Sequence, residues 1–153
     1  MDVNLHRRIS KMCSMKTVIF MPRIAAENLI GDYHSAIISI TDPNDSACLK
    51  DGWRDVLRLS FNDVYDGLNT KNRHSFVPFN ATMAADIHSF VGRNESHITT
   101  LVVHCEAGVS RSAAIALVLA GHYGCELKGG STSHANKMIM SMLSDSLDNC
   151  AVI

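Results

Sequence analysis

The stretch that decides the fold is LVVHCEAGVSRSAA, which runs from Leu101 to Ala114. Its opening residues are apolar and partly β-branched, which predicts a buried strand. From Arg111 onward the side chains are apolar on nearly every side, which predicts a buried helix. A short loop joins the two, with Cys105 at its head and Gly108 inside it. The order of strand, short loop and helix predicts an α/β unit.

The loop between this strand and this helix has the features of an anion site. Backbone N–H groups and the helix N-terminus converge on one point there, and Gly108 permits the tight backbone path. The same donors would stabilise the thiolate form of Cys105 and make it a nucleophile. Arg111 can hold two phosphate oxygens in a bidentate fork, and Ser112 can donate toward the sulfur. We expect His104 to orient the loop through a backbone hydrogen bond rather than to act as a base.

The residues from His104 to Ser112 read HCEAGVSRS. This segment resembles the signature of the protein-tyrosine phosphatase superfamily, in which His-Cys is followed by five residues, Arg, and Ser or Thr. The Ala-Gly-Val-Ser-Arg-Ser ending most resembles the compact dual-specificity branch and its small bacterial and viral relatives. Weaker resemblance extends upstream, through Leu57–Leu59 and Ile38–Pro43, to about 120 residues, the ordinary size of one domain.

The resemblance implies the cysteine-phosphatase fold, a single α/β domain with a central, mainly parallel sheet flanked by helices. The phosphate-binding loop would lie between a strand and a buried helix. Cys105 would be the nucleophile and Arg111 the phosphate clamp. The phosphate would be held by the residues that follow the cysteine, namely Glu106, Ala107, Gly108, Val109, Ser110, Arg111 and Ser112.

A phosphatase of this kind also needs a general acid, and the family supplies an Asp from a mobile loop upstream of the cysteine. The candidates are Asp63 and Asp66, in the segment SFNDVYDG. We favour Asp63 because it follows the strand-like run Val56–Phe61 and because its pairing with Asn62 resembles the family's loop. The segment departs from the family's Trp-Pro-Asp pattern, and Asp66 before a glycine is also an ordinary turn signal.

Length and composition predict one soluble globular domain over residues 1–153, with flexible ends at about 1–14 and 147–153. A chain of 153 residues, 46% apolar and 19% charged, can bury one hydrophobic core but not two. A formal net charge of −1 argues against nucleic acid or an anionic membrane as the main partner. We expect a monomer whose partner is a phosphorylated protein substrate.

The cysteines and histidines indicate location and cofactor use. Five cysteines show neither metal-ligand spacing nor a secreted disulfide pattern, and without an export signal they indicate a cytoplasmic protein. Cys125 could trap an oxidised Cys105, although a structural role is the stronger expectation. The last four residues, Cys150 to Ile153, formally fit a prenylation box, but no basic residues flank them, so membrane attachment is not expected. No histidine spacing indicates a metal site, and we expect no metal and no cofactor.

Four apolar runs predict the central strands, namely residues 17–21, 36–40, 56–61 and 100–104. Three helices are predicted around them. The first would begin after Asn80 as N-cap and end at Gly92. The second would run from Arg111 to the glycines at positions 121 and 124, and the third would be capped by the Ser131–Ser133 group. The basic triplet Lys71–Arg73 is read as a solvated turn.

The leading hypothesis is a phosphomonoester hydrolase acting on protein phosphotyrosine, with phosphoserine and phosphothreonine left open. Glu106 next to the cysteine, and the lack of lysine before Arg111, argue against a polyanionic phosphoinositide substrate. Two alternatives remain: a catalytically weak phosphate-binding module, and a rhodanese-like sulfurtransferase that carries a persulfide on Cys105. A lone cysteine is most often a buried, unreactive thiol. The glycine, arginine and serine that follow Cys105 in the loop argue against that interpretation.

Overall fold

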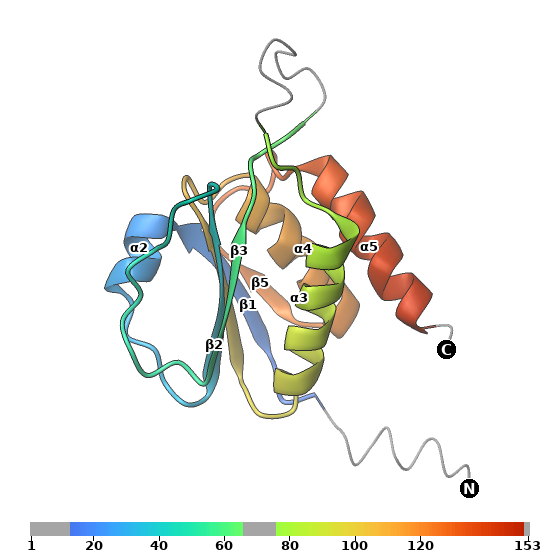
Figure 1. Cartoon of the computed structure of the whole chain (residues 1–153). Coiled ribbons are helices and arrows are strands. Elements are labelled where there is room, and N and C mark those ends of the chain that lie inside the picture. The colour runs from blue at the N-terminus through green and yellow to red at the C-terminus, as the bar shows by residue number, and fades with distance from the viewer. Residues whose placement is uncertain (1–12, 66–75, 152–153) are drawn as a thin grey trace, which may run out of the picture.

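The computed structural model describes residues 13–65 and 76–151 (Figure 1). Among these residues, five strands form one all-parallel sheet in the order β3-β2-β4-β1-β5. The strands are β1 (Thr17–Pro22), β2 (Ser35–Thr41), β3 (Asp55–Ser60), β4 (Thr100–Cys105) and β5 (Glu126–Lys128). The helices are α2 (Arg23–Asn28), α3 (Ala81–Asn94), α4 (Arg111–Tyr123) and α5 (Lys137–Ala151). The chain is therefore a single α/β domain.

The four strands predicted from apolar runs are confirmed, and they form the first four strands of the sheet. The β4 strand occupies the centre, because it pairs with β1 on one side and with β2 on the other. Strand β5 was not predicted. It has three residues with one partly buried side chain, Leu127, which is too little for a periodic signal, and it forms by pairing with β1.

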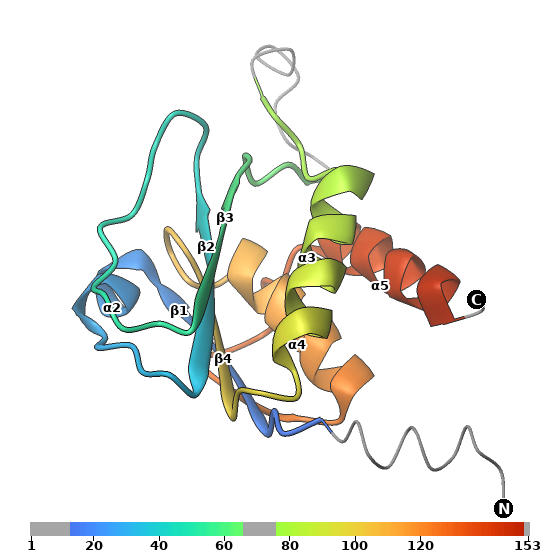
Figure 2. The same cartoon turned by 60° about the horizontal axis from the view of Figure 1, so that its bottom comes forward.

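The helices cover the two faces of the sheet unequally (Figures 1 and 2). Helices α3, α4 and α5 lie on one face, where they enclose the main hydrophobic core. On the other face the short helix α2 covers a small cluster around Ala26, Ile37 and Val102. Helix α4 packs against the sheet on one side and against α5 on the other, which explains why its sequence is apolar almost all round.

Helix α3 begins as predicted but ends later. The side chain of Asn80 accepts a hydrogen bond from the backbone N–H of Met83 at 2.9 Å, which confirms Asn80 as the N-cap. The expected stop at Gly92 is wrong, because the helix continues to Asn94. A glycine costs only about 1 kcal/mol in a helix interior. The buried Asn94 side chain, bonded to Asp55 and to the carbonyl of Phe90, holds the last turn in place.

The ends of the last two helices also combine confirmed and corrected predictions. Of the two glycines predicted to end α4, Gly121 lies inside the helix, and Gly124 terminates it in the left-handed conformation, with φ of 67°. The predicted cap of α5 at Ser131–Ser133 is wrong, since α5 starts at Lys137. The side chain of Asn136 accepts from the N–H of Ile139 at 3.1 Å and does the capping instead. Helix α5 continues to Ala151, so residues 147–151, which were predicted to belong to a flexible end, are helical.

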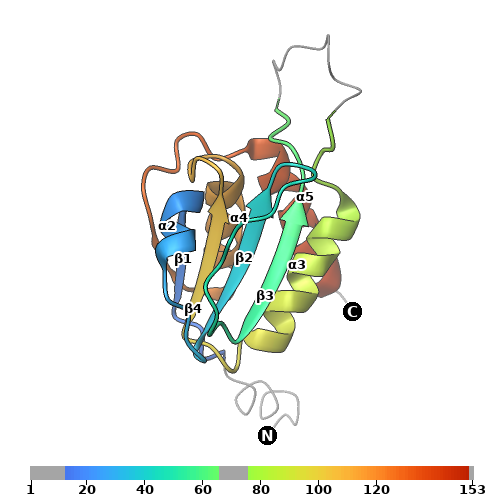
Figure 3. The ribbon, with the colours of Figure 1, turned by 60° about the vertical axis from the view of Figure 1, so that its left-hand side comes forward.

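The parallel arrangement gathers the carboxyl ends of the strands at one edge of the sheet (Figure 3). In the β1–β4 register, Pro22 lies opposite Cys105, so both strands end at the same level. Ligands of open parallel sheets bind at this edge. None of the helices in the described ranges is long and apolar enough to cross a membrane.

Candidate functional site

The sulfur of Cys105 lies at the head of the Cys105–Arg111 loop, at the carboxyl end of the central strand. The residue is 2% exposed. The Ser112 hydroxyl lies 3.1 Å from Sγ, and the backbone N–H of Gly108 donates to Sγ at 3.3 Å. A thiolate at this position would accept both hydrogen bonds, so the loop stabilises negative charge on the sulfur. The serine is where the sequence interpretation expected it.

Gly108 is required by the path of the loop. Its φ is 72°, a backbone conformation that residues with a side chain rarely adopt. A Cβ atom there would also lie 2.3 Å from the backbone nitrogen of Pro22, at the end of the neighbouring strand β1. The loop therefore folds back tightly over β1, and any side chain at this position would push the two apart.

The other N–H groups of the loop are available to an anion. In the described parts of the chain, no acceptor bonds the backbone N–H of Glu106, Ala107, Val109 or Ser110. Unbonded N–H groups are costly unless water or a ligand satisfies them. Together with the N-terminus of α4, they are donors of the kind that bind phosphate in strand-loop-helix turns.

The guanidinium of Arg111 is held by the ends of two neighbouring strands. Its Nη1 donates to Oδ1 of Asp42 at 2.8 Å and to the carbonyl oxygen of Phe61 at 2.7 Å. The side chain of Arg111 is 7% exposed, whereas that of Asp42 is 56% exposed. One nitrogen is therefore anchored, and within residues 13–65 and 76–151 no partner bonds Nε or Nη2. Those two nitrogens can face a phosphate.

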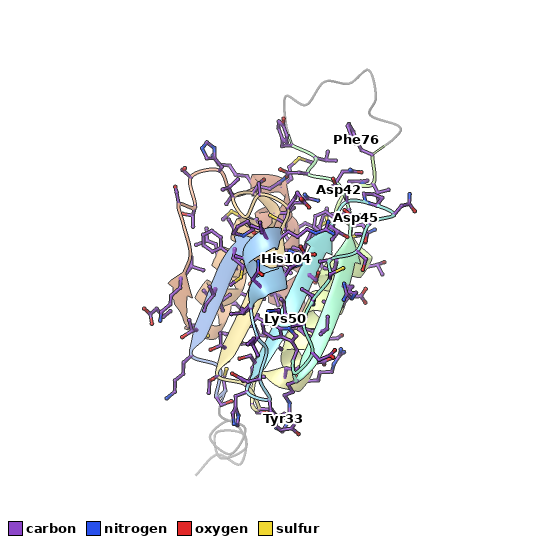
Figure 4. The ribbon with its side chains drawn as sticks, turned by 90° about the vertical axis from the view of Figure 1, so that its left-hand side faces the viewer. Tyr33, Asp42, Asp45, Lys50, Phe76 and His104 are labelled. Atoms are coloured by element: carbon purple, nitrogen blue, oxygen red, sulfur yellow. The ribbon has the colours of Figure 1, made fainter. Side chains whose placement is uncertain are left out.

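Asp42 lies at the same end of the sheet as Asp45 and Phe76, and Tyr33 lies at the opposite end (Figure 4). The sequence interpretation did not assign Asp42 a role. Its position directly after β2, next to the predicted loop in a parallel sheet, was the signal that could have identified it.

His104 is fully buried beneath the loop and bonded on both ring nitrogens. Its Nδ1 lies 3.2 Å from the carbonyl oxygen of Cys105, and its Nε2 lies 2.6 Å from the hydroxyl of Ser39. A carbonyl cannot donate, so Nδ1 carries the proton and Nε2 accepts from Ser39. Burial lowers the pKa of His104, which favours this neutral form. The backbone hydrogen bond agrees with the orienting role expected from the sequence.

Two hydrogen bonds to one carboxylate oxygen hold Asp63 next to the Cys105–Arg111 loop. Its Oδ1 accepts from the hydroxyl of Ser110 at 2.9 Å and from the side-chain amide of Asn136 at 2.7 Å. Asn62, its neighbour, is bonded to the backbone of Val77 through both its N–H and its side-chain oxygen, at 2.7 and 2.8 Å. The alternative acid Asp66 lies outside the described residues, as does the basic triplet 71–73.

A cavity of about 430 Å³ opens beside Asp63 and Ser110. Its remaining walls are Tyr65 and the segment that leads into α5, with the residues Ser133, His134, Ala135, Asn136, Lys137 and Met138. The cavity is next to the loop but is not lined by Cys105 itself. A group attached to a phosphate in the loop could extend into it.

Arg23, directly after β1, forms a second charged cluster at this edge. Its guanidinium donates to the carboxylates of Asp45 at 2.7 Å, Glu27 at 3.3 Å and Glu106 at 3.4 Å, and to the carbonyl oxygen of Ser46 at 3.0 Å. The hydrogen bond from Arg23 lowers the pKa of Asp45. Three carboxylates surround this one cation, so Arg23 ties the loop to its surroundings through Glu106 and is not free to bind an anion.

Cys125 lies too far from Cys105 to trap it as a disulfide. It precedes Glu126, which pairs with Thr17, whereas Cys105 pairs with Pro22. Five residues of strand separate these levels, or about 16 Å. The Cys125 thiol bonds the carbonyl oxygen of Met15 instead, at 3.3 Å, and burial raises its pKa. In the described parts of the chain, no group of three or more His, Cys, Asp or Glu side chains is arranged to hold a metal ion.

Asn136 and Ser39 are the other site residues that sequence reasoning missed. Both act through side-chain hydrogen bonds between segments far apart in the chain, namely Asn136 to Asp63 and Ser39 to His104. Neither forms part of a motif. No protein-family model matches the chain, and no curated protein matches it closely enough to identify a relative.

Proposed function

We propose that this protein is a cysteine-dependent phosphatase with the cysteine-phosphatase fold, of the protein-tyrosine or dual-specificity type. The observation that carries the proposal is the Cys105 sulfur at the head of a loop of unbonded N–H donors, with the Ser112 hydroxyl 3.1 Å away. Arg111 next to the loop, and a carboxyl group bonded to Ser110 of the loop, supply the other parts that phosphoryl transfer needs.

The reaction takes place in two steps. In the first, the Cys105 thiolate attacks phosphorus, an S–P bond forms and the P–O bond to the leaving group breaks, while Asp63 gives its proton to the leaving oxygen. In the second, water attacks phosphorus, the S–P bond breaks and Asp63 takes the proton of the water. Ser112 donates to the departing sulfur. The loop N–H groups and Arg111 stabilise the charge on the non-bridging oxygens.

Protein phosphotyrosine is the substrate we propose, with phosphoserine and phosphothreonine as further candidates. The carboxylate of Glu106, 56% exposed, and that of Asp42 lie around the loop and would repel a substrate carrying several phosphates. A phosphate-binding module without turnover is the second candidate. The observation in its favour is the Arg111–Asp42 ion pair, in which a carboxylate already neutralises part of the positive charge that would hold a phosphate.

The test is hydrolysis of para-nitrophenyl phosphate across pH by the wild type, Cys105→Ser, Asp63→Ala and Asp66→Ala. We expect Cys105→Ser to lower kcat by roughly 10⁴-fold or more, the scale for removing an enzymatic nucleophile. Asp63→Ala should lower kcat by roughly 10²-fold to 10⁴-fold, and Asp66→Ala much less. Cys125→Ser, a thiol at the other end of the sheet, is the matched control.

Turnover by Cys105→Ser at the wild-type rate would exclude the phosphatase mechanism. A folded wild type that binds phosphate without turnover would favour the binding module, and thiosulfate sulfurtransferase activity would favour the rhodanese-like alternative.

A further inference from the structure

Asn136 is a buried side chain whose polar groups are all bonded, and it joins three segments. The residue is 3% exposed. Its amide nitrogen donates to Oδ1 of Asp63 at 2.7 Å and to the carbonyl oxygen of Val64 at 2.9 Å. Its side-chain oxygen caps α5 by accepting from the N–H of Ile139 at 3.1 Å, and its own N–H donates to the carbonyl oxygen of Ser110 at 3.2 Å. It therefore connects the Asp63 segment, the Cys105–Arg111 loop and α5.

Capping α5 does not require an asparagine. A cap needs one side-chain oxygen, and Ser, Thr or Asp supplies it about as well. Asn80 caps α3 in the same way, with its Oδ1 2.9 Å from the N–H of Met83, and it is exposed. What distinguishes Asn136 is its NH₂ group, since both of its hydrogens point to the Asp63–Val64 segment.

These contacts determine which oxygen of Asp63 can carry the proton. Oδ1 accepts from both Asn136 and Ser110, so its two lone pairs are used. No donor in the described parts of the chain bonds Oδ2. A proton on the carboxyl group therefore resides on Oδ2, and the same oxygen is free to exchange it with a substrate or with water.

We infer that Asn136 is a positioning residue for the general acid. It holds Asp63 against the Cys105–Arg111 loop and keeps Oδ2 as the oxygen that transfers the proton. The inference rests on the proposed function. In the first step Oδ2 loses its proton to the leaving oxygen, and in the second step Oδ2 takes a proton from water. Oδ1 keeps its two donors throughout, so the carboxyl group does not have to rotate between steps.

The test is Asn136→Ser, which keeps an oxygen for the cap, adds no charge and removes both amide donors. Asn80→Ser is the matched control, because it makes the same change at a helix cap that does not contact Asp63. Turnover is measured with two aryl phosphates, phenyl phosphate, whose leaving group needs a proton, and 2,4-dinitrophenyl phosphate, whose leaving group does not.

We expect Asn136→Ser to lower kcat/KM for phenyl phosphate by roughly 10-fold to 100-fold, because a misplaced acid loses most of its effect. The loss for 2,4-dinitrophenyl phosphate should stay within about threefold, since proton transfer contributes little there. Asn80→Ser should change neither rate by more than about twofold, because it leaves Asp63 untouched. In an Asp63→Ala background, Asn136→Ser should cause no further loss with phenyl phosphate, because the two changes act through the same proton.

The outcomes separate this inference from the function it rests on. Equal losses on both substrates, or a full additional loss in the Asp63→Ala background, would mean that Asn136 acts only through structure. If Asp63→Ala itself spares phenyl phosphate turnover, the acid assignment fails. If Cys105→Ser retains turnover, the proposed function fails. Should Asn136→Ser not fold, Ser110→Ala removes the other donor to Oδ1 without touching the cap, and it must show the same dependence on the leaving group.

Discussion

Two arginines follow adjacent strands at the same edge of the sheet, and they differ in what they can bind. Pro22 and Cys105 end the paired strands β1 and β4. Arg23 comes directly after Pro22, whereas Arg111 follows Cys105 after a loop of five residues. Among the described residues, Arg23 contacts three carboxylates, whereas Arg111 contacts one, that of Asp42; each guanidinium also bonds one backbone carbonyl.

The difference lies in the connection between strand and helix. The β1–α2 connection has no loop, and α2 has six residues without a side-chain cap. The β4–α4 connection turns tightly at Gly108 and leads into a buried helix of 13 residues. The carboxyl edge of a parallel sheet is thus not in itself an anion site. The site that we propose depends on the loop, whose N–H groups lie beside a cation with two nitrogens that no described residue bonds.

Within this comparison, the largest expected effect comes from replacing Arg111 by lysine, with Arg23→Lys as its counterpart. Arg111→Lys should lower kcat for para-nitrophenyl phosphate by roughly 10²-fold to 10³-fold, because a point charge cannot hold Asp42 and two phosphate oxygens together. Arg23→Lys should lower it by less than about tenfold, because that cation is neutralised by carboxylates near the surface and is not expected to contact the phosphate. Steady-state kinetics on both variants checks the comparison. Similar losses would show that the two arginines do not differ in function.

A second prediction compares Gly108, in the β4–α4 loop, with Gly121, in the helix that follows it. Gly108→Ala should destabilise the fold by about 2 kcal/mol or more, because a Cβ is strained at φ of 72° and would meet the backbone of Pro22. The midpoint of thermal unfolding should fall by roughly 5 °C. Gly121→Ala lies inside α4, where a Cβ would meet nothing within 4 Å, and it should stabilise by about 0.5 to 1 kcal/mol. Thermal unfolding of both variants measures the contrast, and an unchanged midpoint for Gly108→Ala would contradict it.

The smallest expected effect is the pH dependence that the buried His104 gives to the free energy of unfolding. Its folded pKa is lowered by burial, whereas the unfolded value is about 6.5. Below about pH 6.5 the unfolded chain therefore binds a proton that the folded chain does not, so this stability is present above pH 6.5 and is lost as the pH falls through the folded pKa.

Replacing His104 should remove this contribution. In His104→Gln the slope of unfolding free energy against pH, below about pH 6.5, should be smaller by up to about 1.4 kcal/mol per pH unit. Urea unfolding at several pH values gives the slope, with exposed His97→Gln as control. The same slope in His104→Gln and the wild type would mean that His104 is not held neutral.

Much of this fold could be read from local patterns. Strands β2 and β4 are predicted because strands buried on both faces are continuous apolar runs. Asn80 and Gly124 mark helix ends by their own chemistry. Helix α2 and strand β5 were missed because six and three residues carry too little periodicity. The start of α5 was misjudged because the Ser131–Ser133 group looks like a cap, whereas Asn136 supplies the cap.

The sequence by itself determined strands β1 to β4, the Cys105–Arg111 loop and the positions of Cys105, Gly108 and Ser112, because these features depend on residues that are neighbours in the chain. Only the tertiary structure decided which carboxylates join them. Asp42 reaches Arg111 across 69 positions, and Asn136 reaches Asp63 across 73. Such contacts exist because a parallel sheet brings the ends of non-consecutive strands together, and no local pattern records that proximity.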